Sequence, residues 1–297
     1  MNYKIIIWGL GGVYNKHLNV IKYFESTQSI EVIALTANNL PDISILDGYR
    51  VVPVTMIQSL DYDYIMIMND VHFADIVKTA LENGVLRERI LTFRILEIPN
   101  LNFNEYIRLK KSRLSIISNN CWGGIVYNNL GMECLSPFKN LFVEDDDYIR
   151  LLTNLKGYLE ERIRFSHYAI DEHSKKEYPV MMIGDIAIHC NHDDNPETAA
   201  RNWEKRCEKL NYNNLFIEMY TENPEIADQF QAMERYEKKI CFVPFESGNE
   251  NAFRLELHGR QTEFWEAVNS NAGNGNNCFT YDMIGLLNME RRYRGMR

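Results

Sequence analysis

The chain has 297 residues, of which 45% are hydrophobic and 12% aromatic, and its formal net charge is -9. This composition is that of a globular protein with one large or two smaller cores, and the negative charge argues against nucleic-acid binding, which needs a clustered basic face. No apolar run reaches the length of a membrane span, and the first residues lack the arrangement of a signal peptide. We therefore expect a cytoplasmic protein with no nucleic-acid partner and no membrane span.

Six cysteines are scattered along the sequence without a CxxC pair. A disulfide scaffold would show a higher density of cysteines in a shorter chain. We therefore expect most of these thiols to be reduced, and several of them to lie in the core.

Strand and helix patterns alternate in the first hundred residues. A strand is predicted at Lys4–Trp8, followed by a glycine turn and a helical pattern of apolar residues. Further strands are predicted at Glu31–Leu35, Tyr64–Met68 and Arg89–Phe93, and a helix at Phe73–Glu82. This order favours a parallel sheet with right-handed crossovers.

The glycine turn matches part of a dinucleotide-binding fingerprint. Gly9 and Gly11 take the first two positions of G-x-G-x-x-G, but Tyr14 stands at the third. Residues 36–39, after the second strand, also lack the acid that would bind a ribose diol. We therefore disfavour NAD, leave the cofactor unassigned, and keep Gly9, Gly11 and Gly12 as candidate cofactor-binding residues.

Four motifs in this part of the chain resemble the small Rossmann-like domain often attached to bacterial surface-polysaccharide enzymes. They are KIIIWGLGG at 4–12, DGYRVVP at 47–53, LDYDYIMIM at 60–68 and RERIL at 87–91. The resemblance implies a domain that holds a nucleotide or sugar nucleotide, or one that only supports its neighbour.

A break in the pattern at Pro99–Asn104 divides the chain. We predict two domains, 1–104 and 105–297, and a bridging helix at Glu105–Ser112. The second domain again alternates strands with helices, which predicts an α/β fold of two Rossmann-like three-layer domains with mostly parallel sheets. Its strands are predicted at Leu114–Ser118, Val180–Ile183, Asp185–Cys190, Asn214–Tyr220 and Lys239–Val243, and its helices at Tyr148–Glu161, Glu197–Leu210, Pro224–Met233 and Tyr281–Asn288, with a flexible loop at Gly273–Asn277.

The second half resembles an uncharacterised bacterial family, the domain of unknown function numbered 1919, which is associated with exopolysaccharide biosynthesis. The resemblance spans about residues 112–245 and implies a fold and a pathway, but no catalytic residue. Cys190, Asp193 and the added N-terminal module depart from the family pattern. The matching motifs are SNNCWGG at 118–124, SPFKNLF at 136–142, YIRLLTNLKGYL at 148–159, YPVMMIGDIAIHCNHDD at 178–194 and ETAARNWEKRCEKLNYNNLFIEM at 197–219.

The segment Leu114–Gly124 is the most informative stretch, because an apolar strand ends abruptly in polar residues and two glycines. Open α/β sheets bind ligands at the carboxyl ends of their strands, where this turn should lie. Cys121 is a candidate nucleophile there, with His189 or His192 as its base. The alternative is a buried or ligand-lining cysteine in this turn.

Asp185, His189, His192 and Asp193 form the densest group of potential metal ligands, but their spacing lacks the helical HExxH register. We therefore predict an acid or base role for a histidine and no metal site. The structural alternative is a polar strand end whose side chains bind loop amides.

Seven residues are candidate substrate-binding residues, each with a structural alternative such as an Asx turn, core packing or a surface ion pair. They are Asn119, Asn120, Trp122, Gly123, Gly124, Asp185 and Arg206.

Two hypotheses for the function follow. The first is a transferase of bacterial exopolysaccharide or cell-surface polysaccharide synthesis that uses a nucleotide-sugar or acyl donor. The second is a noncatalytic ligand-binding or assembly protein of the same pathway. Either protein would bind a small sugar or nucleotide-type ligand, and a homo-oligomer is compatible with both.

Overall fold

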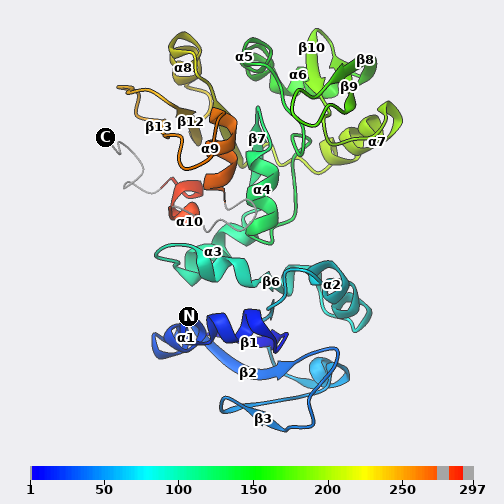
Figure 1. The fold of residues 1–297 in the computed structure, drawn as a ribbon, viewed down its shortest axis with the longest axis vertical. Helices are drawn as coiled ribbons and strands as arrows, with labels where there is room; N and C mark the ends of the chain where they lie inside the picture. Colours follow the sequence, from blue (N-terminus) through cyan, green and yellow to red (C-terminus); the bar gives the residue numbers. More distant parts are fainter. Residues whose placement is uncertain (1, 273–280, 290–297) are drawn as a thin grey trace. The chain divides into compact units, whose positions relative to one another are not determined.

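A computed structural model describes residues 2–272 and 281–289 (Figure 1). It confirms the predicted α/β class, because both main sheets are parallel and flanked by helices. The described chain forms two compact units: the first ends at Tyr106 and takes in Asn129–Gly131, and the second holds the rest. The loop predicted at Gly273–Asn277 lies outside the described residues.

The first unit is built on a four-stranded sheet with the order β2-β1-β5-β6, and every pairing in it is parallel. All four predicted strands and the predicted helix between the last two strands are present. The elements are β1 (Tyr3–Trp8), α1 (Gly12–Ser26), β2 (Ile30–Thr36), β5 (Tyr64–Ile67), α2 (Phe73–Glu82) and β6 (Ile90–Thr92), with a short hairpin of β3 (Ile45–Leu46) and β4 (Tyr49–Arg50).

Buried apolar strands explain this sheet. Residues 5–8 of β1 and all four residues of β5 are buried, as expected for central strands covered on both faces. Helix α2 places Ile76, Val77 and Ala80 against the side chains of Ile65 and Ile67 in one core cluster. The periodicity of apolar residues that predicted α2 is thus the periodicity of its buried face.

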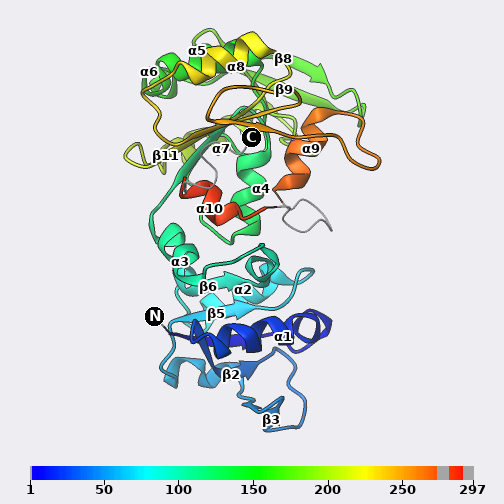
Figure 2. The same cartoon turned by 90° about the vertical axis from the view of Figure 1, so that its left-hand side faces the viewer.

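The second unit contains a parallel sheet with the order β13-β12-β11-β7. Figure 2 shows α5 and α8 on one side of it, and α4, α9 and α10 on the other. The elements are β7 (Ser115–Ser118), α4 (Trp122–Asn129), α5 (Asp145–Thr153), α6 (Leu155–Glu160), α7 (Pro196–Cys207), β11 (Leu215–Tyr220), α8 (Pro224–Gln231), β12 (Lys239–Val243), β13 (Ala252–Arg254), α9 (Phe264–Asn271) and α10 (Met283–Leu287).

The two faces of this sheet bury different side chains. On one face, Ile217 and Met219 join a core cluster with residues of α5, α7 and α8. On the other face, Phe216 and Phe242 contact the indole ring of Trp122, with ring centroids 6.1 and 5.7 Å apart. Side chains of β11 point alternately to the two faces of the sheet, so this strand contributes to the hydrophobic core on each side of a three-layer unit.

An antiparallel sheet with the order β10-β9-β8 is the main addition to the predicted pattern. Its strands are β8 (Arg164–Ile170), β9 (Glu177–Ile183) and β10 (Ile186–His189). The sequence predicted strands at the positions of β9 and β10, but β8 was missed.

The helix predicted at Tyr148–Glu161 is two helices in the structure. Asn154 separates α5 from α6, and its side-chain oxygen accepts the amide of Gly157 at the start of α6. Asp145, Asp146 and Asp147 lie in the first turn of α5. Their negative charges complement the helix dipole there.

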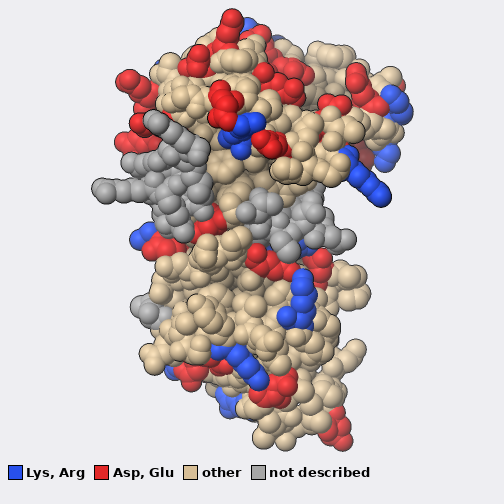
Figure 3. Space-filling model, turned by 60° about the vertical axis from the view of Figure 1, so that its left-hand side comes forward, with Lys and Arg blue, Asp and Glu red and all other residues tan. Residues whose placement is uncertain are grey.

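No helix within residues 2–272 and 281–289 is long and apolar enough to cross a membrane. On the face drawn in Figure 3, Lys and Arg side chains are scattered among Asp and Glu side chains and do not merge into one basic surface.

Candidate functional site

The carboxyl ends of β7 and β11 lie side by side in the second unit. Ser118, the last residue of β7, is in register with Glu218 of β11. After Ser118 the chain turns through three residues before α4 begins at Trp122. The candidate turn is therefore at the edge where open α/β sheets bind ligands.

Asn119 is held by the backbone of β11. Its side-chain Nδ2 donates to the carbonyl of Tyr220 over 3.0 Å, and its Oδ1 accepts the amide of Tyr220 over 3.1 Å. Its own backbone carbonyl accepts the amide of Val143. The side chain of Asn119, a candidate substrate-binding residue, thus continues the hydrogen bonding between β7 and β11 by one residue.

Asn120 connects the turn to a buried acid. Its Nδ2 donates to both carboxylate oxygens of Glu218, over 2.9 and 3.0 Å, and its Oδ1 accepts the amide of Trp122 over 2.7 Å. Asn120 is only 3% exposed. Its amide therefore orients Glu218 and caps the first turn of α4.

Glu218 is the functional candidate that sequence reasoning missed. It is fully buried, and this burial raises the pKa of its carboxyl to about 8. The signal was present in the strand LFIEMY, where one acid stands among apolar residues. Acids are rarely fully buried, so such a position is itself a reason to suspect function.

Cys121 and His192 are brought together by the fold. The Sγ atom of Cys121 lies 3.6 Å from Nε2 of His192, although 71 positions separate the two residues. Phe142 and His189, the last residue of β10, form a backbone bridge with N to O distances of 3.0 and 2.9 Å. The carbonyl of Leu141 also lies 4.0 Å from Sγ.

The thiol of Cys121 is protonated at neutral pH. Burial raises its pKa to about 11, and the nearby carboxylate of Glu218 acts in the same direction. The carbonyl of Cys121 accepts the amide of Ile125, so the amides of Gly123 and Gly124 belong to the first turn of α4 and have no acceptor within the helix. These amides can stabilise negative charge that develops beside Sγ.

Two further residues complete this edge. Thr221 donates its hydroxyl to Oδ2 of Asp145 over 2.5 Å, and Oδ1 of Asp145 accepts Nδ2 of Asn119 over 3.3 Å. Burial raises the pKa of Asp145, the first residue of α5. The edge is therefore acidic, and its carboxylates are tied to neighbouring side chains.

His189 occupies a different place from His192. Its ring is stacked on Phe142 with centroids 4.3 Å apart, and its Nδ1 is 3.2 Å from the hydroxyl of Tyr178. Burial lowers the pKa of His189, which favours the neutral imidazole. Within the described chain, His189 makes no direct contact with Cys121.

Asp185 and Arg206 are engaged elsewhere. Asp185 accepts the hydroxyl of Tyr158 over 2.8 Å and pairs with Arg150 over 3.5 Å. It precedes β10, whereas His189 ends that strand, so about 13 Å of strand separates them. Arg206 donates to the carbonyl of Lys139 over 2.9 Å.

Trp122 and Gly123 are packed in the interior. The indole of Trp122 is fully buried, and its Nε1 donates to Oδ1 of Asn271 over 3.0 Å. A Cβ on Gly123 would lie 2.6 Å from Oγ of Ser118, so only glycine lets α4 approach β7 this closely. A Cβ on Gly124 would meet Oδ1 of Asn140 at 3.2 Å.

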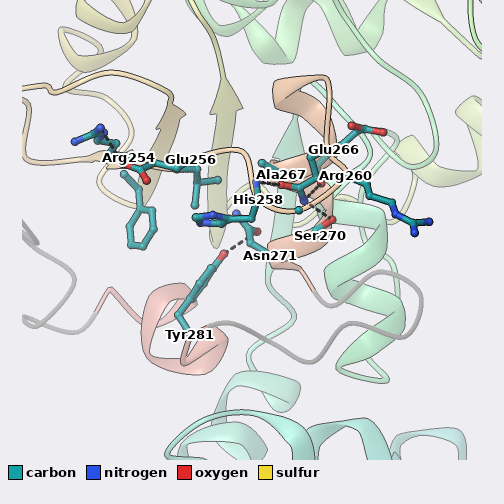
Figure 4. Close-up of a pocket in the computed structure, with 13 residues that line it drawn as sticks. Arg254, Glu256, His258, Arg260, Glu266, Ala267, Ser270, Asn271 and Tyr281 are labelled. Carbon is teal, nitrogen blue, oxygen red and sulfur yellow. Dashed lines mark hydrogen bonds and ion pairs between the residues drawn. The ribbon is translucent and has the colours of Figure 1, made fainter.

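A hollow of about 1130 Å³ lies among β13, the segment after it, α9 and Tyr281. Figure 4 shows the hydroxyl of Tyr281 directed at Asn271 and the ring of His258 close by, whereas the guanidinium groups of Arg254 and Arg260 point away to either side. Oδ1 of Asn271 accepts from Tyr281 over 3.0 Å, but its buried Nδ2 has no hydrogen-bond partner among the described residues.

The glycine turn of the first unit is a separate feature. Gly9 has a φ of 115°, and a Cβ there would lie 2.9 Å from the carbonyl oxygen of Met68, so close packing requires this glycine. Gly11 and Gly12 face open space at the start of α1. Tyr14 is buried, and its hydroxyl donates to Asp47 over 2.9 Å.

No group of three or more His, Cys, Asp or Glu side chains in the described part of the chain is arranged to hold a metal ion. The chemistry available at the carboxyl edge is that of a thiol, an imidazole, a buried carboxyl and helix amides.

Comparison with known proteins gives a family and little more. Residues 92–288 match the model of a domain of unknown function, DUF1919, and residues 1–91 match a model described as C2185-like, N-terminal. An uncharacterized protein of Haemophilus influenzae is 28% identical over 138 residues, which are 46% of this chain. That match spans 64% of the relative, less than two thirds of its length.

Proposed function

The chain belongs to the DUF1919 family, and on the geometry of its carboxyl edge we propose that it is a transferase in which Cys121 carries an acyl group. The observation behind the proposal is the 3.6 Å contact between Sγ of Cys121 and Nε2 of His192. A thiol beside an imidazole suits acyl transfer through a thioester and favours an acyl donor over a nucleotide sugar. The setting we propose, cytoplasmic synthesis of bacterial exopolysaccharide or cell-surface polysaccharide, is supported by the resemblance of the sequence motifs.

In the proposed reaction, His192 acts as the general base. Because the pKa of Cys121 is about 11, the thiol is protonated before reaction, and Nε2 of His192 accepts this proton as Sγ attacks the acyl carbon. The amides of Gly123 and Gly124 stabilise the oxyanion. The donor's leaving group departs with the proton from His192, and a thioester remains on Cys121.

The second half of the reaction reverses these roles. An acceptor hydroxyl loses its proton to Nε2 of His192 and attacks the thioester carbon. The new ester forms, and the Cys121 thiolate leaves and regains the proton from His192. His189 is not required in either step, because its ring is engaged by Phe142 and Tyr178.

Acetyl-CoA is the probe that tests the first half of the reaction. We expect intact-mass measurement to show one added acetyl group, and peptide mapping to place it on Cys121. His192→Asn should slow the labelling by about 100-fold or more, the usual size of a general-base contribution. Cys134→Ala is the control, because Cys134 is also a partly buried free thiol. Unchanged labelling of Cys121→Ala would contradict the proposal.

A second candidate function, noncatalytic ligand recognition, is favoured by the hollow beside α9. The Nδ2 of Asn271, which has no hydrogen-bond partner among the described residues, is a buried donor that a ligand oxygen could satisfy. Thermal-shift measurements with neutral monosaccharides and with uridine diphosphate test this candidate, because a ligand of the native state raises its stability. A shift that Asn271→Ala abolishes and Cys121→Ala preserves would favour recognition, whereas no shift with any probe would count against it.

A further inference from the structure

The strand β8 is an exposed sheet edge. It pairs with β9 on one side and, within the described chain, with no strand on the other. Its outer backbone amides and carbonyls therefore form a free ladder, which can pair with a strand of another chain. Figure 2 shows β8 and β9 at the top of the second unit.

Large apolar side chains stand on this edge. Phe165, Tyr168 and Ile170 are 45%, 49% and 60% exposed, and the rings of Phe165 and Tyr168 contact each other with centroids 5.1 Å apart. Natural edge strands are commonly protected by charged side chains, proline or a β-bulge, and in β8 the charge, Arg164, lies at the first residue, with no lysine or proline after it. A bulge between Phe165 and His167 leaves residues 167–170 in unbroken register with β9.

The charges along this segment are arranged for pairing with a second copy. Arg162 and Arg164 stand at its start, after Glu160 and Glu161, and Asp171 and Glu172 follow its end, ahead of Lys175 and Lys176. Neither arginine makes an ion pair with another described residue, and Glu172 makes none either. In an antiparallel pair of identical strands, the start of each strand lies beside the end of the other. The arginines at the start of one copy would thus lie beside Asp171 and Glu172 of the other, and Glu160 would lie near Lys175, with each pairing made twice.

We infer that β8 pairs antiparallel with β8 of a second copy of this chain. The resulting homodimer has one continuous six-stranded antiparallel sheet, and a two-fold axis passes close to His167 and Tyr168. The pairing covers the exposed rings and satisfies the free backbone ladder. It does not involve the turn at Cys121, so this inference is independent of the proposed function.

Charge exchange on the full chain tests the inference by analytical ultracentrifugation over about 1 to 100 μM. We expect wild type to form a dimer. Arg164→Glu should raise the dissociation constant of the dimer by about tenfold or more, because the substitution places like charges opposite each other at both ends of the paired strands. The double variant Arg164→Glu/Glu172→Arg restores opposite charges and should restore the dimer.

Two other variants control for unrelated effects. Lys205→Glu makes the same charge change on an exposed position of α7 and should leave the dissociation constant unchanged. Tyr168→Lys places a lysine at the centre of the edge and should give a monomer. A wild-type monomer at every concentration would overturn the inference, as would a dimer that neither Arg164→Glu nor Tyr168→Lys weakens.

Discussion

The indole nitrogen of Trp122 donates a hydrogen bond of 3.0 Å to Oδ1 of Asn271, which is 149 residues further along the chain. Trp122 starts the helix that follows Cys121, and Asn271 ends the helix that lines the hollow. One buried hydrogen bond therefore joins the helix after Cys121 to the helix beside the hollow.

Trp122→Phe should remove this bond and retain most of the ring packing. We expect the free energy of unfolding to fall by about 1 kcal/mol more than in Trp203→Phe. Trp203 is a suitable control because it is also buried but makes no hydrogen bond to a described residue. Urea unfolding measures both variants, and equal losses would show that the bond contributes nothing.

Glu218→Gln should change how stability depends on pH. The native pKa of Glu218 is about 8 and its ordinary value is 4.5, so between these values the native state keeps a proton that the unfolded state has released. The free energy of unfolding of wild type therefore falls as pH rises through this window and levels off above about pH 8. Glu218→Gln has no carboxyl to titrate at this position, so its free energy of unfolding should rise relative to that of wild type as the pH rises.

Urea unfolding from about pH 5 to pH 9 measures that difference, which should reach a few kcal/mol at the upper end. Glu222→Gln, an exposed position just after the same strand, is the matched control and should track wild type. A constant offset between Glu218→Gln and wild type would contradict the prediction.

Gly123→Ala should destabilise the second unit by about 1 to 3 kcal/mol, the usual cost of overpacking. The added methyl group would lie 2.6 Å from Oγ of Ser118 and 3.0 Å from Cγ2 of Ile116, so α4 must move away from β7. Gly12→Ala is the control, because a Cβ there meets nothing within 4 Å. Thermal unfolding of both variants checks this, and equal midpoints would refute the close approach.

Lys239→Met should destabilise the protein by about 2 kcal/mol or more. The buried ammonium group of Lys239 donates to the carbonyls of Phe230, Gln231 and Met233, which lie at and just after the end of α8, over 2.7 to 3.1 Å. Methionine keeps the packing but removes these three hydrogen bonds from a charged donor, although the carbonyls of Phe230 and Met233 still accept the backbone amides of Met233 and Tyr236. Lys238→Met removes one bond, to Oδ1 of Asn214, and should cost less in the same unfolding measurement.

Apart from β13, whose three residues form no such run and which was not predicted, the strands of the parallel sheets were predictable because they are short apolar runs followed by turns or helices. The edge strand β8 was not, because every residue of RFSHYAI is at least partly exposed, so no alternation marks a buried face. The helix α9 was missed as well, although its capping box of Glu263 and Glu266 is readable in the sequence.

The candidate site shows a similar division. The sequence predicted that Cys121 follows a strand at the carboxyl edge, and the structure has it there. It left His189 and His192 equivalent, because contacts between segments far apart in the sequence place His192 beside Sγ and pair His189 with Phe142. Glu218 was not predicted, because the apolar residues around it in LFIEMY indicate an ordinary buried strand.

Asn119 gives the turn at Cys121 an unusual rigidity. Its side chain takes both backbone positions of Tyr220 that a further strand residue would take, so the turn is fastened to β11 as if the sheet continued. Cys121 cannot shift along the sheet without breaking two hydrogen bonds at once. Under the proposed function, an acyl donor would therefore meet a thiol whose backbone is already fixed to the sheet before it binds.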